Sequence, residues 1–163
     1  MTDVSSDELA YTLGLISGEG SFFITFVRDD RYNHNVWYSP KMSVSMGEYS
    51  RELLKSQQAL YGLGTVTDHP KGYAWTLSSR SDCHELRRLI DGHIRRHENT
   101  AFVQSQKYQS YQKWCEALEI LQPDRSLSES EVIELADLRE GMNNIQAASH
   151  ISPEEIRRTL TQE

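Results

Sequence analysis

The sequence predicts an α+β fold, in which a four-stranded antiparallel sheet carries helices on one face. Segments rich in β-branched and aromatic residues occur in two pairs, and a polar or Pro/Gly-containing turn separates the members of each pair, as is typical of β-hairpins. A segment with apolar residues at helical spacing precedes each pair. The predicted order is therefore αββαββα, which packs helices on one face of the sheet, followed by further helices.

The first helix should begin at residues 6–8, where Ser-Asp-Glu offers an N-cap and acids for the first turn. Leu9, Leu13 and Ile16 follow at helical spacing. The two glycines within residues 18–20 should end this helix.

Two hairpins should supply the four strands. The first pairs residues 21–27 (SFFITFV) with residues 36–46 (VWYSPKMSVSM), both rich in β-branched and aromatic side chains. The second pairs residues 64–69 with residues 73–79 around Pro70-Lys71-Gly72.

Helices account for the rest of the chain. Residues 49–61 should form a helix that Gly62 ends. Ser81-Asp82 should cap another helix, which ends near Gly92 or His97. Further helices are predicted at 102–121, at about 128–142 and near 153–160.

Charge is unevenly distributed along the chain. Residues 1–20 carry a net charge of −4, residues 21–113 carry +4 and residues 114–163 carry −7, within a total of −7. A basic middle block permits a nucleic-acid-binding core although the total is acidic. We expect one domain at residues 1–121 and an acidic helical C-terminal extension at residues 122–163.

Composition excludes several classes of protein. No apolar stretch approaches the roughly 20 residues of a membrane span, and the N-terminus carries Asp3, Asp7 and Glu8 rather than the basic run of a targeting peptide. Cys83 and Cys115 lack the spacing of a disulfide framework or zinc module. We therefore expect a cytoplasmic globular protein without a membrane partner.

Three histidines, His84, His93 and His97, lie close together in the sequence, but no Glu completes an H-E-x-x-H pattern. We expect them to be exposed on an Arg-rich helix rather than to bind metal.

The segment at residues 11–22 (YTLGLISGEGSF) carries the strongest chemical signal. Gly14 and Gly18 are four apart, so one face of the first helix lacks side chains and allows another helix to approach. Two such helices, packed glycine face to glycine face, would bring two Glu19 carboxylates together, and paired carboxylates recruit divalent metal ions. The same residues also fit an ordinary helix end followed by a solvated Glu and a core strand.

GLISGEGSF resembles the signature of the LAGLIDADG homing endonuclease family, with residues 14–16 matching G-L-I and residues 18–20 matching A-D-G. Residues 52–66 and 73–77 resemble the family's next helix and strands, so that the resemblance covers about residues 8–118. It implies a homodimer, because members with one copy of the motif act in pairs. The expected interface comprises Tyr11, Gly14, Leu15 and Gly18.

The resemblance also implies roles for single residues. Glu19 matches the acidic metal ligand, and the Gly20 backbone would lie beside the metal. Lys107 is the expected catalytic basic residue, with Arg95 or Arg96 as alternatives. Met46 falls where some relatives place a Gln that orients water, and Ser45 or Glu48 could substitute for that group.

In this family the exposed face of the sheet reads DNA bases in the major groove. Alternation along the strands would turn Phe22, Ile24 and Phe26 toward the helices. The expected DNA-binding residues are Ser21, Phe23, Thr25, Val27, Arg28, Arg31, Lys41, Ser43, Ser45, Thr65, Thr67, His69 and Thr76.

The resemblance thus implies a site-specific, Mg²⁺-dependent double-strand DNA endonuclease, encoded in a mobile intron. One alternative is a noncatalytic nucleic-acid-binding protein of the same fold, either a maturase that binds intron RNA or a DNA-binding regulator. Another is a degenerate relative that binds neither duplex DNA nor intron RNA.

Overall fold

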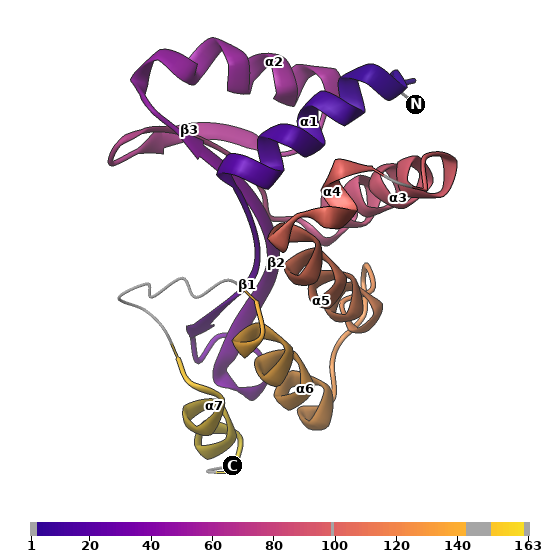
Figure 1. The fold of residues 1–163 in the computed structure, drawn as a ribbon. Helices are drawn as coiled ribbons and strands as arrows, with labels where there is room; N and C mark the ends of the chain where they lie inside the picture. Colours follow the sequence, from indigo (N-terminus) through magenta and orange to yellow (C-terminus); the bar gives the residue numbers. More distant parts are fainter. Residues whose placement is uncertain (1–2, 99, 143–150, 162–163) are drawn as a thin grey trace.

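An antiparallel sheet of four strands forms the centre of the molecule in the computed structural model, which describes residues 3–98, 100–142 and 151–161 (Figure 1). The strand order is β1-β2-β4-β3. The strands are β1 (Gly20–Arg28), β2 (Val36–Met46), β3 (Thr65–His69) and β4 (Gly72–Leu77). The predicted α+β class and four-stranded antiparallel sheet are confirmed.

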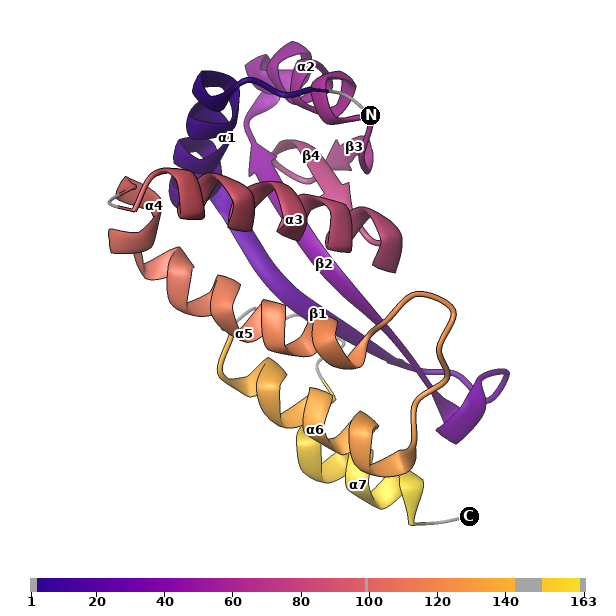
Figure 2. The same cartoon turned by 90° about the vertical axis from the view of Figure 1, so that its right-hand side faces the viewer.

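The helices follow the predicted order. They are α1 (Ser6–Glu19), α2 (Arg51–Tyr61), α3 (Arg80–Arg96), α4 (Ala101–Gln104), α5 (Gln106–Ile120), α6 (Glu129–Glu140) and α7 (Pro153–Leu160), with short 3₁₀ turns η1 (Asn33–Asn35) and η2 (Glu48–Ser50). Helices α3 and α5 lie side by side on one face of the long β1–β2 hairpin (Figure 2).

Side-chain alternation along β1 builds the core. Phe22, Ile24 and Phe26 are each at most 1% exposed, whereas the residues between them are only half-buried. Phe22 packs against the rings of Tyr111 and Trp114 on α5, with ring centroids 5.3 and 5.0 Å apart. The prediction that these three residues face the helices is confirmed.

Both predicted helix caps are displaced along the chain. The α1 cap is Ser5, whose hydroxyl accepts a hydrogen bond from the Glu8 amide, and the α3 cap is Ser79, whose hydroxyl accepts from the Asp82 amide. Because Ser79 already caps α3, strand β4 ends at Leu77 rather than at residue 79. Gly62 ends α2 in the left-handed conformation with φ of 65°, as predicted.

The single helix predicted at residues 102–121 is wrong, because Ser105 divides it into α4 and α5. Ser105 has an extended conformation with ψ of 154°, and its hydroxyl donates to the Phe102 carbonyl oxygen. The break turns α5 so that Tyr111 and Trp114 reach Phe22 on β1.

The C-terminal helices pack against the rest of the molecule. Helix α6 contacts α5 and β1, and α7 contacts α6 and η1. Val132, Leu135 and Ile156 are fully buried in the same apolar cluster as Phe22. The division of the chain at residue 121 stays a prediction.

Candidate active site and nucleic-acid interface

Glu19 is the last residue of α1, and Gly20 begins β1 at once. A Cβ at Gly20 would lie 2.7 Å from the carbonyl oxygen and 2.8 Å from the Cα of Ile16. Only glycine therefore allows the chain to turn directly from this helix into this strand. The close turn places Glu19 directly before β1, which is an edge strand of the sheet.

The electrostatics at this position favour a cation. The Gly20 amide donates to Ile16, so the carbonyl groups that follow Ile16 have no further helical donor, and the C-terminal end of a helix carries partial negative charge. No basic residue lies in the last turn. Glu19 is exposed, and among the described residues no hydrogen bond or ion pair holds its carboxylate. The negative end of the helix dipole repels a carboxylate at this position, and a bound cation would offset that repulsion.

One chain does not supply a complete metal site. Within the described residues, no group of three or more His, Cys, Asp or Glu side chains could hold a metal ion. The oxygen donors present are the Glu19 carboxylate and backbone carbonyls, which are the hard ligands that Mg²⁺ accepts. These donors fit a divalent cation that completes its coordination with groups from outside this chain.

The predicted dimer residues form an open face of α1. Tyr11 is 54% exposed, and Leu15 is half-buried. A Cβ at Gly14 or Gly18 would meet nothing within 4 Å. The fold of one chain therefore gives no steric reason for glycine at either position, although glycine inside a helix costs about 1 kcal/mol relative to alanine.

Lys107 lies near the beginning of α5, on the side of the molecule where β1 begins. It is half-buried and one helical turn before Tyr111, whose ring packs on Phe22, three residues after Glu19. The fold therefore brings the start of α5 close to the start of β1.

The alternative basic residues, Arg95 and Arg96, lie elsewhere. They end α3 beside His97, whose Nε2 is 2.8 Å from the Ser6 hydroxyl oxygen at the beginning of α1. Glu19 is at the other end of the 14-residue helix, roughly 20 Å away at 1.5 Å per residue. Of the three basic residues considered, Lys107 is the one that the fold brings toward Glu19 of the same chain.

Met46 ends β2 next to the candidate site. Gly20 pairs with Val44, so β2 extends two residues beyond the start of β1, toward the end of α1. The Met46 side chain is half-buried against the core, while Ser45 lies on the opposite face of the strand and Glu48 is exposed in η2. Met46 and the two polar residues that could replace it in orienting water, Ser45 and Glu48, therefore lie close together at the end of β2.

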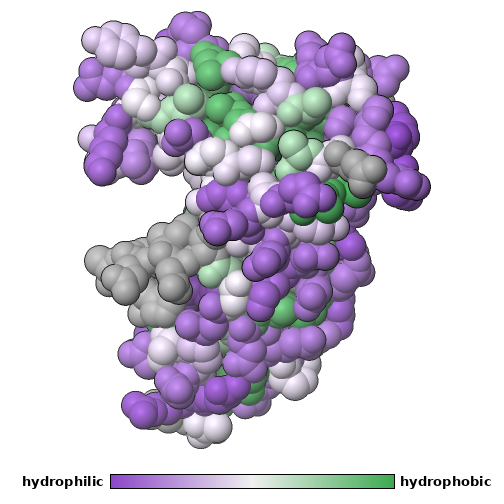
Figure 3. Space-filling view, in the orientation of Figure 1, coloured by the Kyte–Doolittle hydropathy of each residue, from purple (hydrophilic) through white to green (hydrophobic). Residues whose placement is uncertain are grey.

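The face of the sheet opposite α3 and α5 is accessible and carries a row of hydroxyl groups. Ser21, Ser43, Thr76 and Thr65 lie in one row across the four strands, and the hydroxyl oxygens of Ser43 and Thr76 are 2.9 Å apart. All of the predicted DNA-binding residues are half-buried or exposed. We call this surface the outer face. Figure 3 shows a hollow on the left of the molecule, which is the side that the outer face borders.

Two predicted DNA-binding cations at the end of the β1–β2 hairpin have acidic partners. The Arg31 guanidinium donates to both oxygens of Asp29, at 2.9 and 2.6 Å, and this pairing lowers the pKa of Asp29 to about 2. Arg28 lies 3.9 Å from a carboxylate oxygen of Glu155 on α7. Sequence reasoning missed both partners.

Trp37 was also missed as part of the outer face. It is half-buried and pairs with Val27, a predicted DNA-binding residue. Extending the alternation of Lys41, Ser43 and Ser45 back along β2 would have found it.

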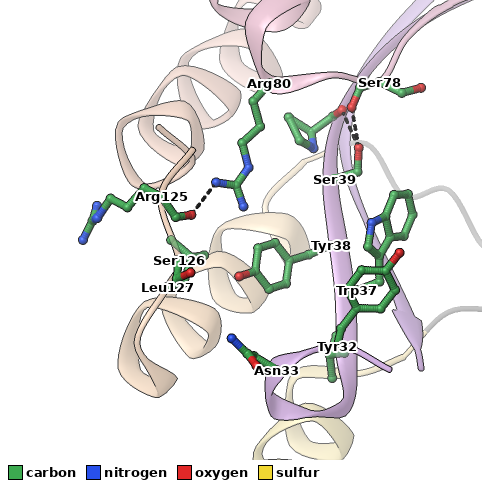
Figure 4. A pocket seen from close by; sticks show the side chains of 12 residues that line it. Tyr32, Asn33, Trp37, Tyr38, Ser39, Ser78, Arg80, Arg125, Ser126 and Leu127 are labelled. Atoms are coloured by element: carbon green, nitrogen blue, oxygen red, sulfur yellow. Dashed lines mark hydrogen bonds between the residues drawn. The ribbon is translucent and has the colours of Figure 1, made fainter. Parts of the chain in front are cut away.

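A pocket of about 350 Å³ lies at the far end of β2, between Tyr32, Trp37, Tyr38 and Arg80 (Figure 4). The Arg80 guanidinium donates to the carbonyl oxygens of residues 122 and 125 at 2.8 and 2.7 Å and lies over the Tyr38 ring. Val36 in this pocket is eight residues from Val44 on the same strand, or about 26 Å. The pocket is therefore separate from Glu19.

The expectation that the three histidines are exposed is wrong for His93, which is only 5% exposed. Burial lowers the pKa of His93, and the neighbouring His97 and Arg96 lower it further. His84 is bound through Nε2 to the Leu121 carbonyl oxygen.

Neither cysteine is poised as a nucleophile, because burial raises the pKa of Cys83 and raises that of Cys115 to about 11.

Comparison with known proteins identifies the family. The sequence profile of the LAGLIDADG endonucleases matches residues 12–118, which include the second half of α1, the whole sheet and most of α5. The chain belongs to the LAGLIDADG endonuclease family. A comparison with curated proteins found no match.

Solved structures of LAGLIDADG homing endonucleases share the fold. The homing endonuclease I-TnaI is 18% identical with a TM-score of 0.72, and the match covers 98% of each chain. I-CvuI, described with an uncleaved DNA target in the presence of Mg, is 15% identical with a TM-score of 0.73, over 95% of this chain and 93% of its own. I-SmaMI, bound to cleaved DNA, is 18% identical with a TM-score of 0.71.

The extent of the I-SmaMI match differs between the two chains. It covers 94% of the present chain but 48% of I-SmaMI. The present chain therefore spans about half the length of that LAGLIDADG relative.

The helices that the structure describes were also compared with the requirements of a membrane span, and none of them has both the length and the apolar character that a span needs.

Proposed function

We propose that this LAGLIDADG protein is a site-specific double-strand DNA endonuclease that works as a homodimer with a divalent metal ion, Mg²⁺, at the dimer interface. One observation carries the proposal. Glu19 is exposed at the negative end of α1, without a partner among the described residues, and adjoins an open glycine face. Neither the acid at the helix end nor the glycines inside the helix stabilise the fold of an isolated chain.

Homodimerisation is supported by the face of α1 that carries Tyr11, Gly14, Leu15 and Gly18. Gly14 and Gly18 allow two helices to approach closely, because neither glycine presents a side chain and the space around each is open. Pairing two α1 helices through this face would bring their Glu19 carboxylates together. The match to half of I-SmaMI also supports pairing, since a chain of that length has room for two such folds.

Glu19 and the Gly20 backbone would hold the metal ion from each subunit. When bound, the cation would polarise the phosphate, activate water and stabilise the leaving 3′ oxygen. Lys107 would place a positive charge toward the reacting phosphate and so stabilise the charge that develops there. The steric fit of Gly20 against Ile16 would hold Glu19 in position during this reaction.

The outer face would bind duplex DNA. The Lys41 ammonium, the His69 imidazole and the rows of Ser and Thr hydroxyls would hydrogen-bond to phosphates and to base edges. Two relatives with the same fold, I-CvuI and I-SmaMI, are described in complex with DNA. The hairpin cations Arg28 and Arg31 would exchange their acidic partners for phosphates on binding.

A selection from randomised duplexes tests this function. Ca²⁺ would be supplied during selection to permit binding without cutting, and the enriched duplex would then be incubated with Mg²⁺. We expect an enriched site and cleavage of both strands within it. Failure to enrich any duplex would contradict the proposal.

The second candidate is a noncatalytic nucleic-acid-binding protein that binds DNA or intron RNA. Met46 favours it, because a half-buried thioether at the end of β2 cannot orient water as an amide would. A duplex or intron RNA that is bound but remains uncut in Mg²⁺ would support this candidate instead.

A further inference from the structure

The pocket beside Arg80, at the far end of β2, has the features of a small-molecule site that the proposed DNA cleavage does not use. Three segments distant in sequence build it, namely the end of the β1–β2 hairpin, the start of α3 and the connection between α5 and α6. Its volume of about 350 Å³ is within the range of small-molecule sites. Arg80 and Tyr38 lie on one side of β2 and the Trp37 ring lies on the other (Figure 4).

Arg80 gives this pocket an unbalanced positive charge. Its guanidinium is held in place, because Nη1 donates to the carbonyl oxygens of Gln122 and Arg125 at 2.8 and 2.7 Å. Among the described residues, Nε and Nη2 have no partner and no carboxylate pairs with this arginine. The residues that line the pocket include neither Asp nor Glu. A half-buried cation without a counter-ion is unfavourable, so the site favours an anion that accepts hydrogen bonds from the two free nitrogens.

Tyr38 gives the same pocket a flat apolar wall. Its ring is half-buried, and the ring centre lies 5.7 Å from the guanidinium carbon of Arg80. Asn33 and Ser126 add hydrogen-bonding groups to the lining. An aromatic ring packs favourably against tyrosine and is attracted by a guanidinium. An anion that also carries a planar ring with polar edges therefore suits all of these groups together.

We propose that the pocket binds a nucleoside monophosphate, either as a free nucleotide or as an unpaired nucleotide of a single strand. The phosphate would accept hydrogen bonds from Nε and Nη2 of Arg80, which form the fork that matches two phosphate oxygens. The base would pack against the Tyr38 ring, while Asn33 and Ser126 would bond to the base edge or the sugar. The bases of duplex DNA are stacked and paired, so a duplex on the outer face would not fill this pocket.

Isothermal titration calorimetry of the full chain without DNA tests the pocket. AMP, GMP, CMP and UMP are the probes, and at least one of them should bind once per chain with a dissociation constant below about 1 mM. Inorganic phosphate lacks the ring and the parent nucleoside lacks the charge, so each should bind roughly tenfold more weakly or worse. If none of the four nucleotides binds, or if phosphate alone binds as tightly, the proposal is contradicted.

Two variants locate the bound nucleotide. Arg80→Gln removes the charge and should raise the dissociation constant about tenfold or more. Tyr38→Leu removes the stacking ring, keeps an apolar side chain and leaves the bonds of Arg80 to residues 122 and 125 intact, and it should raise the constant roughly fivefold. Circular dichroism spectra like that of the wild type would show that both variants fold.

The matched control is Arg95→Gln, which makes the same change of charge at the exposed far end of α3, about 22 Å from Arg80. It should leave the dissociation constant unchanged. An unchanged constant in both Arg80→Gln and Tyr38→Leu would show that the nucleotide binds elsewhere and would contradict the proposal.

A displacement experiment distinguishes the two sources of the nucleotide. A short single-stranded homopolymer of the preferred base is added to the complex with the mononucleotide. Displacement would identify an unpaired nucleotide of a strand as the ligand, and its absence would identify the free nucleotide; either result supports the pocket. Equal displacement by a duplex of the same length would contradict a pocket that takes an unpaired base.

The pocket and the proposed cleavage can fail separately. A protein that cuts its selected duplex but binds none of the nucleotides contradicts the pocket alone. A protein that binds a nucleotide through Arg80 and Tyr38 but enriches no duplex contradicts the proposed function alone.

Discussion

At the scale of single residues, the motif at residues 18–20 identifies the candidate site, because a steric requirement and an electrostatic one fall on adjacent residues. Position 20 must be glycine, because a Cβ there would overlap the carbonyl oxygen of Ile16. Glu19 lies at the C-terminal end of a helix, where the helix dipole disfavours an acid. Sequence reasoning identifies both residues. It cannot identify Glu155 as the acidic partner of Arg28, because that pairing depends on how the hairpin and α7 meet. The pairing of Arg31 with Asp29 depends on the conformation of the hairpin turn.

Gly20→Ala should destabilise the fold by about 1–3 kcal/mol, because the new Cβ would overlap backbone atoms of Ile16 that cannot move freely. Urea unfolding measures the change in the free energy of unfolding. Gly14→Ala is the matched control. Below the concentration at which the chain dimerises, this variant should be at least as stable as the wild type, because its Cβ meets nothing within 4 Å.

At the scale of helices and strands, alternation and glycine positions predict the elements, but the ends depend on tertiary contacts. The bounds of β2 agree with the prediction because β-branched and aromatic residues fill that segment between polar turns. The break at Ser105 lacks the Gly or Pro that marks many helix ends, and the rings of Phe102 and Tyr111 pack edge to face across it. The caps at Ser5 and Ser79 lie beside other serines that serve equally well in isolation.

His93 should make the stability of the α1–α3–α4 region depend on pH. Its pKa is lowered in the folded state because burial and the charges of His97 and Arg96 oppose protonation. The unfolded chain therefore binds a proton more readily, and stability should be full above the unfolded pKa of about 6.5 and should fall as the pH decreases below it. Urea unfolding between pH 5 and pH 8 measures this.

The control for that measurement is His93→Gln, which cannot titrate. This variant should lose part of the decrease in stability on the acidic side. An identical pH dependence in wild type and variant would show that other groups cause the decrease.

At the scale of the whole molecule, the proposed function requires a protein of net negative charge to bind DNA. The acidic residues concentrate in the C-terminal segment, and its helices pack beside the hairpin rather than across the middle of the sheet. The charge of each segment is readable from the sequence. How α6 and α7 attach is not, because Val132 and Ile156 are buried against elements distant in sequence.

Binding of the selected duplex should weaken steeply with salt, because cations of the outer face displace counterions from phosphates. With on the order of four phosphates neutralised, affinity should fall about 100-fold between 50 and 200 mM salt. Fluorescence anisotropy of a labelled duplex in Ca²⁺ measures it. A flat response would contradict binding of DNA to the outer face.

The most direct test of the central claim compares the wild type with Glu19→Gln on the selected duplex. Cleavage in Mg²⁺ should fall at least ~100-fold in the variant, while its binding in Ca²⁺ persists. Glu134→Gln, an exposed change on α6, should cut like the wild type. Cleavage by Glu19→Gln at the wild-type rate would contradict the assignment of Glu19 to the metal centre and, with it, the proposed catalytic site at the end of α1.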